Sequence, residues 1–194
     1  MEQINKDKVF VDIETSGLRA DEGAEIVRIE AIKVFGGEIK DRFFTYVSPE
    51  RALREEIKTI TGIDENTLEG APDIKTAITR FGKFVEDCAI IGYGLPFTME
   101  FLNYYGNKYG IKFDNRSLDL YPIIRKMLDK RIKNFHLETV GKFFVIDAKS
   151  EPEIMFRLTR LQCYNDNEFY TDYAKYIVPA LRELNGGEKG CGER

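Results

Sequence analysis

The first quarter of the chain has the alternation of apolar and polar residues that is typical of β-strands. Residues 8–14 form an almost continuous apolar run, as expected of a central strand that is buried on both faces of a sheet. Residues 25–36 and 39–47 alternate with period two, so they predict two strands with one covered face. Short apolar runs at 89–93 and 117–120 add two more strands, which makes five in all.

Segments with apolar residues at helical spacing lie between and after the later strands. The segment 74–85 is the clearest, because Pro72 and Asp73 before it form a start signal for a helix. We expect helices over 52–59, 74–85, 97–110, 122–129 and 137–144, and a last helix that ends at Leu184. This order predicts an α/β fold in which a mixed five-stranded sheet is flanked by helices.

Composition limits the organisation of the chain and its partners. With 194 residues, 43% hydrophobic and 32% charged, one domain over residues 1–184 is expected, and the polar, glycine-rich residues 185–194 predict a disordered tail. No apolar run reaches membrane-span length and no leader pattern is present, which indicates a cytoplasmic protein without membrane contact. The net charge of −4 excludes a protein that coats nucleic acid over a broad basic face, but it allows an enzyme that holds a few terminal nucleotides beside bound metal.

The candidate chemistry lies at the end of the first strand, in the string VFVDIETSGL (residues 9–18). Side chains alternate between the two faces of a strand, so Asp12 and Glu14 share one face. Two carboxylates held this close repel each other unless a positive charge lies between them, and oxygen ligands favour Mg²⁺ or Mn²⁺. The alternative is a half-exposed strand that shows two solvated acids.

The same string resembles the first motif of the DEDD superfamily of 3′-5′ exonucleases, the DnaQ-like and PolC-type proofreading nucleases. EIVRIEAIKV (residues 25–34) is similar to the second strand of that family, and REEIKTITGID (residues 54–64) is similar to its helix and "TGI" turn. The resemblance covers about three quarters of the chain. It implies a ribonuclease H-like fold and hydrolysis of DNA or RNA from the 3′ end with release of nucleoside monophosphates. It also implies two divalent ions held by about four carboxylates, and a polymerase or helicase as partner.

The second motif of the family corresponds to YGLPFTMEFL (residues 93–102). Phe97 and the later Phe-Leu pair fit it, whereas Thr98 occupies the position of the metal-binding Asp. A threonine hydroxyl is a neutral, weak ligand. Glu100 lies two positions further along the helix, which turns it away from that site, and we expect it to be a surface acid.

Two registers are open for the third motif, which follows an apparent insertion over 147–167. In NEFYTD (residues 167–172), Asp172 takes the ligand position. In YAKYIV (residues 173–178), which resembles the tyrosine-type branch, Ile177 takes that position and no third ligand remains. The only histidine, His136, lies between two apolar residues and is expected to pack rather than to act as a base.

The resemblance therefore gives an incomplete set of site residues. Asp12, Glu14 and Asp172 are the candidate catalytic and metal-binding residues, enough for one Mg²⁺ or Mn²⁺ ion. Thr15, Leu18, Phe97 and Thr98 are the candidate contacts to a single-stranded nucleic acid 3′ end. A basic group near the fourth predicted helix (Arg125, Lys126, Lys130, Arg131 and Lys133) is either a phosphate contact or a solvated helix face.

Two functions follow from this set. The first is a metal-dependent 3′-5′ exonuclease-like protein whose activity is weak or lost. The alternative is an inactive pseudo-exonuclease that serves as a nucleic-acid-binding or protein-interaction module. Whether the chain is an enzyme stays open, because loss of a general base alone reduces a rate by about 10²–10⁴-fold.

Overall fold

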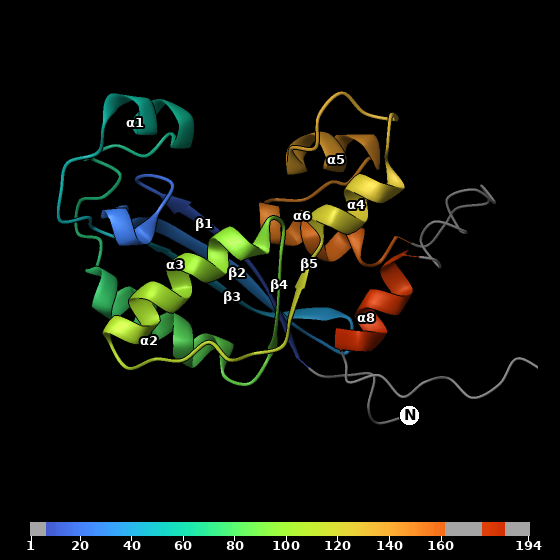
Figure 1. The fold of residues 1–194 in the computed structure, drawn as a ribbon, viewed down its shortest axis with the longest axis horizontal. Helices are drawn as coiled ribbons and strands as arrows, with labels where there is room; N and C mark the ends of the chain where they lie inside the picture. The colour runs from blue at the N-terminus through green and yellow to red at the C-terminus, as the bar shows by residue number, and fades with distance from the viewer. Residues whose placement is uncertain (1–6, 162–175, 185–194) are drawn as a thin grey trace, which may run out of the picture.

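The computed structural model describes residues 7–161 and 176–184. Five strands form one sheet in the order β3-β2-β1-β4-β5 (Figure 1). Their bounds are Lys8–Thr15 for β1, Ile26–Phe35 for β2, Glu38–Tyr46 for β3, Ala89–Gly92 for β4 and Ser117–Asp119 for β5. The pairs β1-β2 and β2-β3 are antiparallel, whereas β1-β4 and β4-β5 are parallel. The predicted mixed five-stranded sheet is confirmed.

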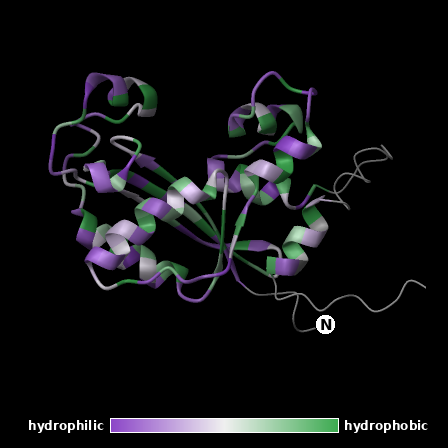
Figure 2. Cartoon of the chain, in the orientation of Figure 1, coloured by the Kyte–Doolittle hydropathy of each residue, from purple (hydrophilic) through white to green (hydrophobic). Residues whose placement is uncertain are grey.

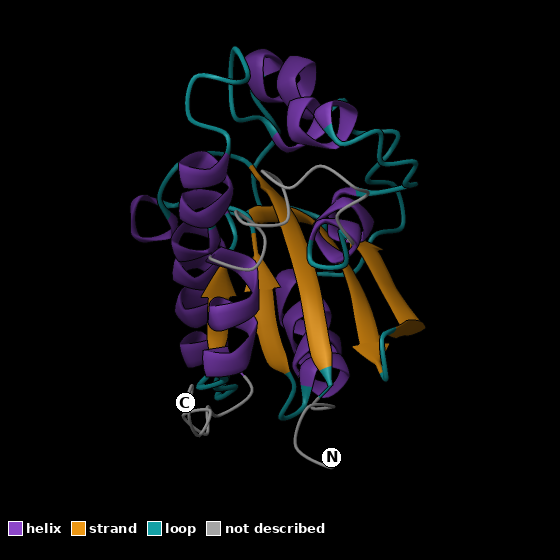
Figure 3. Cartoon of the chain, turned by 90° about the vertical axis from the view of Figure 1, so that its right-hand side faces the viewer, coloured by secondary structure: helices purple, strands orange, loops and turns teal. Residues whose placement is uncertain are grey.

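The strand β1 is central because its sequence can be covered on both faces. Val9, Val11 and Ile13 are buried on one face, whereas Phe10 is buried in a second cluster on the other. Figure 3 shows the sheet between two layers of helices. A strand in this position is apolar where both faces are covered, as Val9, Phe10 and Val11 are here.

The first face is covered by α2 (Ile74–Val85) and α3 (Leu95–Lys108), which pack against each other (Figure 1). The predicted bounds of α2 are confirmed, and the side chain of Asp73 accepts a hydrogen bond from the backbone N–H of Thr76 at 2.7 Å, as an N-cap does. Figure 2 shows both helices with green and purple stretches, as expected for helices with one apolar side.

The second face is covered by α4 (Tyr121–Met127), α5 (Leu137–Phe143), α6 (Glu151–Leu158) and α8 (Val178–Leu184). Within this layer α5 packs on α6, and α6 packs on β1. Phe156 of α6 meets Phe10 of β1 edge to face, with ring centroids 5.7 Å apart. The layer therefore positions α6 directly over the strand that carries the two acids.

A smaller cluster lies outside these two layers and holds α1 (Glu55–Thr61). Leu53, Ile63 and Leu68 pack there around Val27 of β2. The helix was predicted at 52–59, but Arg54 is extended and the first turn begins at Glu55. It ends at Gly62 with φ of +69°, a left-handed conformation that glycine adopts without strain.

The segment 147–167, expected to be an insertion, contains the helix α6, which was not among the predicted helices. Pro152 lies in its first turn, and Met155 and Leu158 are buried. One sequence prediction on the second face is wrong. His136 was expected to pack, but it is exposed at the residue before α5, because the start of the helix turns Leu137 inward. None of the described helices has the length and apolar character needed to cross a membrane. The predicted tail at 185–194 lies outside the described residues.

Candidate active site

Asp12 and Glu14 lie near the end of β1, and both are half-buried. The neighbouring Val11 and Ile13 belong to the apolar cluster on the opposite face. The two acids therefore leave the same face of the sheet, as the alternation predicts. In the antiparallel pair with β2, Glu14 lies directly opposite Arg28.

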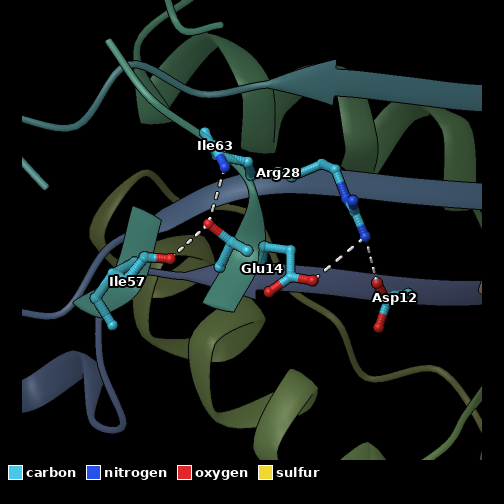
Figure 4. A network of polar contacts seen from close by, with 6 residues as sticks. Asp12, Glu14, Arg28, Ile57 and Ile63 are labelled. Atoms are coloured by element: carbon cyan, nitrogen blue, oxygen red, sulfur yellow. Dashed lines mark hydrogen bonds and ion pairs between the residues drawn. The ribbon is translucent and has the colours of Figure 1, made fainter. Parts of the chain in front are cut away.

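Arg28 bridges the two acids. Its Nη2 donates to Oδ2 of Asp12 at 3.2 Å and to Oε1 of Glu14 at 3.5 Å. Figure 4 shows the guanidinium reaching from β2 across to both carboxylates on β1. Another nitrogen of the same guanidinium, Nε, is buried and has no hydrogen-bond partner in the part of the chain that the structure describes. The position between the two acids is thus taken by a cation of the protein itself.

Burial and neighbouring charges both change the pKa values of Asp12 and Glu14. Burial raises the pKa of Asp12 well above its ordinary 3.8, the negative charge of Glu151 raises it further, and Arg28 opposes this rise. Burial also raises the pKa of Glu14, against the effect of Arg28 and with a contribution from Glu151. Both groups would therefore gain from a nearby cation, since their charged forms are disfavoured by loss of water.

The start of α6 completes the surroundings of the acids. Glu151 is its first residue, and the hydroxyl of Ser150 just before it is buried without a hydrogen-bond partner among the described residues. The sequence carried a signal for this helix that the prediction missed. Ser150 followed by Glu153 three positions later is the spacing of a capping box, although no side-chain cap forms at Ser150.

Glu153 fixes α6 to the sheet. This carboxylate, 6% exposed, accepts from Arg157 one turn later on α6 at 2.8 Å and from Arg42 on β3 at 3.2 Å. The contact with Arg42 joins segments 111 residues apart in the sequence. This link adds to the packing of Phe156 on Phe10 in holding α6, and with it Glu151, over β1.

The described residues bring only two of the predicted metal ligands, Asp12 and Glu14, to one place. Among them, no three His, Cys, Asp or Glu side chains gather closely enough to hold a metal. Thr98, at the position of the second-motif acid, is neutral and 5% exposed on α3. Glu100 is exposed, as expected, and its negative charge contributes to raising the pKa of Arg19, after the larger effect of Asp21. Asp172, the third predicted ligand, lies outside the described residues.

The alternative register of the third motif places Ile177 at the ligand position. In the structure this residue is 1% exposed and belongs to the apolar cluster of the second face, together with Leu184 of α8. Its neighbour Tyr176 lies under the Nζ of Lys126, 4.9 Å from the ring centroid. An apolar side chain in this place contributes packing and no ligand.

The predicted substrate residues differ in their accessibility. The hydroxyl of Thr15 donates to the carbonyl of Gly17 at 2.7 Å and so shapes the turn after β1. Leu18 is 82% exposed beyond that turn. Phe97 is partly exposed at the start of α3, against the ring of Phe101. Leu18 and Phe97 offer apolar surface, whereas the side chain of Thr98 is covered.

Comparisons with known proteins agree with the resemblance to exonucleases. The model of the exonuclease family RNase_T matches residues 9–142. The DNA polymerase III subunit epsilon of Aquifex aeolicus is 33% identical over 160 residues, which are 77% of this chain and 79% of that protein. A DNA polymerase III PolC-type of Caldanaerobacter subterraneus is 30% identical over 160 residues, but these are 77% of this chain and only 11% of that protein. The chain thus spans a small part of its PolC-type relative.

A solved structure shows the same fold. Exonuclease I of E. coli in complex with an oligonucleotide superposes with a TM-score of 0.70 at 18% identity. The match covers 80% of this chain and 40% of that chain. At this identity the likeness shows the arrangement of strands and helices, and the chemistry has to be argued from the residues of this chain.

Proposed function

This chain belongs to the exonuclease family RNase_T, and on that premise we propose that it acts on the 3′ ends of single-stranded DNA or RNA. The proposed reaction is hydrolysis of the terminal phosphodiester bond with release of a nucleoside monophosphate. The observation that carries the proposal is the pair of carboxylates on one face of β1, half-buried and with raised pKa values. A surface strand with two solvated acids would not have these properties.

Asp12 and Glu14 would hold one Mg²⁺ or Mn²⁺ ion through their oxygens. Such an ion, when bound, supplies stabilisation of the charge that develops on the phosphate and eases deprotonation of a water. The protein residues would orient the 3′ end against that position. Asp172 would add a third ligand in the first register of the third motif.

The substrate would be held on both sides of the acids. Leu18 and Phe97 present exposed apolar groups on which the terminal nucleoside can rest. The five basic residues at the end of α4 and in the loop to α5 are all exposed, and they would contact phosphates further along the strand. Thr15 would act through the turn that it shapes, and Thr98 through its packing at the start of α3.

The relatives suggest a partner and a location. Two of them are named as DNA polymerase III proteins, so we propose that this chain works beside a polymerase or helicase in the cytoplasm. Exonuclease I is described in complex with an oligonucleotide, which supports a single strand as the substrate.

A second candidate function is binding of a 3′ end without cleavage. It is favoured by the arginine between the two acids and by Thr98 in the place of an acid. The two candidates share the fold and the two acids, and they differ only in turnover.

Degradation of a 5′-labelled oligonucleotide, as DNA and as RNA, tests the proposal. We expect shortening from the 3′ end with Mn²⁺ or Mg²⁺ that is lost in Asp12→Ala/Glu14→Ala. A matched control is Asp87→Ala/Asp114→Ala, which removes two exposed acids from the loops before β4 and β5 and should leave cleavage unchanged. Binding of the oligonucleotide without any shortening would select the second candidate, and the absence of both would refute the proposal.

A further inference from the structure

Arg28 takes the place in which the two acids of the site would hold a metal ion. We infer that its guanidinium is a built-in counter-ion, so that a divalent cation enters the Asp12–Glu14 pair only by displacing it. The inference deepens the proposed function, because it takes these acids as the metal-binding residues. It concerns cation binding alone and does not depend on cleavage.

The register of the sheet puts Arg28 in this position. Arg28 on β2 is the direct cross-strand partner of Glu14 on β1. From this position its side chain also reaches Asp12, which lies two residues before Glu14 on β1. One nitrogen, Nη2, serves both carboxylates, at 3.2 and 3.5 Å. A metal ion that uses the same two oxygens would lie within a few ångströms of this nitrogen, where two positive charges repel each other strongly because little water separates them.

The surroundings make this a competition between cations rather than a fixed structural pair. The side chains of Arg28 and Asp12 are 20% and 21% exposed, so both are reached by solvent and by ions. Because Nε has no partner among residues 7–161 and 176–184, the described contacts do not give the guanidinium a full set of hydrogen bonds. Glu30, opposite Asp12 in the register, adds a further negative charge close to Arg28. A guanidinium with an alternative acidic neighbour can leave the pair without losing all of its electrostatic stabilisation.

The charge count of the site supports the same conclusion. Asp12 and Glu14 both pair with the single guanidinium of Arg28, so two acids are balanced there by one positive charge. Removal of Arg28 would leave two neighbouring acids without their cation, so the pair would bind an added cation more tightly. A divalent ion would bind better than a monovalent one, because each carboxylate interacts with twice the charge.

Direct measurement of Mn²⁺ binding to the free protein tests the inference. Arg28→Gln should bind Mn²⁺ at least ten-fold more tightly than the unaltered protein, which corresponds to about 1.4 kcal/mol, and Asp12→Asn/Glu14→Gln in the same background should abolish the gain. Lys33→Gln removes a positive charge from the same strand at its pair with Glu86, and should leave the Mn²⁺ affinity unchanged. Equal affinity of Arg28→Gln and the unaltered protein, or no binding to Arg28→Gln, would overturn the inference.

A measurement on the unaltered protein covers the case in which Arg28→Gln does not fold. The Nε–Hε resonance of Arg28, assigned by its loss in Arg28→Lys, should shift as Mg²⁺ is added, because the guanidinium must leave the carboxylates. Calorimetric binding of Mg²⁺ without any shift would show that the ion and the arginine coexist, which contradicts displacement. Tighter Mn²⁺ binding by Arg28→Gln without nucleolytic cleavage would retain the inference and reject the exonuclease.

Discussion

Glu153 offers a quantitative test of how α6 is held over the candidate site. It is almost fully covered, while its partners Arg42 and Arg157 are 51% and 50% exposed. The substitution Glu153→Gln keeps the shape of the side chain and removes its charge. The two arginines keep access to water, so the cost is the loss of charge-assisted hydrogen bonds and not the burial of unpaired cations.

The magnitude follows from these contacts. Each charge-assisted hydrogen bond contributes about 1 kcal/mol more than its neutral counterpart, and solvent at the half-exposed arginines reduces the sum, so we expect a loss of about 2 kcal/mol in the free energy of unfolding. For a chain of this size that loss corresponds to a decrease in Tm of about 4–8 °C. Chemical unfolding followed by circular dichroism measures the free energy, and thermal unfolding measures the Tm.

The pKa of Glu153 predicts how the stability difference between the two proteins changes with pH. Burial alone would raise the pKa of Glu153, but hydrogen bonds from Arg157 and Arg42 and their charges outweigh it and lower the pKa below its ordinary 4.5. A lowered folded-state pKa means that the stabilisation is complete above the unfolded value and is lost as the pH falls through the folded one. The difference between the two proteins should therefore be constant near neutral pH and shrink below about pH 4.5.

An exposed ion pair on α5 provides the control. Glu138 and Lys142 are 74% and 75% exposed, so Glu138→Gln should leave the Tm unchanged because water already solvates both groups. If Glu153→Gln were as stable as this control at neutral pH, or if its deficit persisted in acid, the reasoning about the buried carboxylate would be refuted.

Two further substitutions test the backbone and the packing. Val145 is 89% exposed with φ of +53°, a strained conformation for a β-branched residue. Val145→Gly should therefore raise the free energy of unfolding by about 1 kcal/mol. An unchanged or lower free energy in a urea titration would contradict the assigned strain. Gly106 of α3 leaves no room for a Cβ, which would lie 2.6 Å from the carbonyl oxygen of Ile111. Gly106→Ala should therefore lower the free energy of unfolding by about 1–3 kcal/mol, although alanine has the better helix propensity. A Tm equal to or above that of the unaltered protein would show that the backbone yields at this contact.

The sequence alone determined the parts of this protein that depend on local pattern. Apolar runs and their period gave the five strands, and alternation along β1 put Asp12 and Glu14 on one face. The start signal at Asp73 gave the bounds of α2. These features are local, because a strand or a capped helix imposes its period on the residues within it, whatever the rest of the chain does.

The tertiary structure decided what surrounds the two acids. Arg28 reaches them only because the register of β1 against β2 sets it opposite Glu14, and that register belongs to the paired strands and not to either strand alone. The helix α6 brings Glu151 close to the acids because Phe156 packs on Phe10 and Glu153 bonds to Arg42, a residue 111 positions away. Ligand types can therefore be predicted from neighbours in the sequence, whereas their charge balance is set by neighbours in space, which only the packed chain determines.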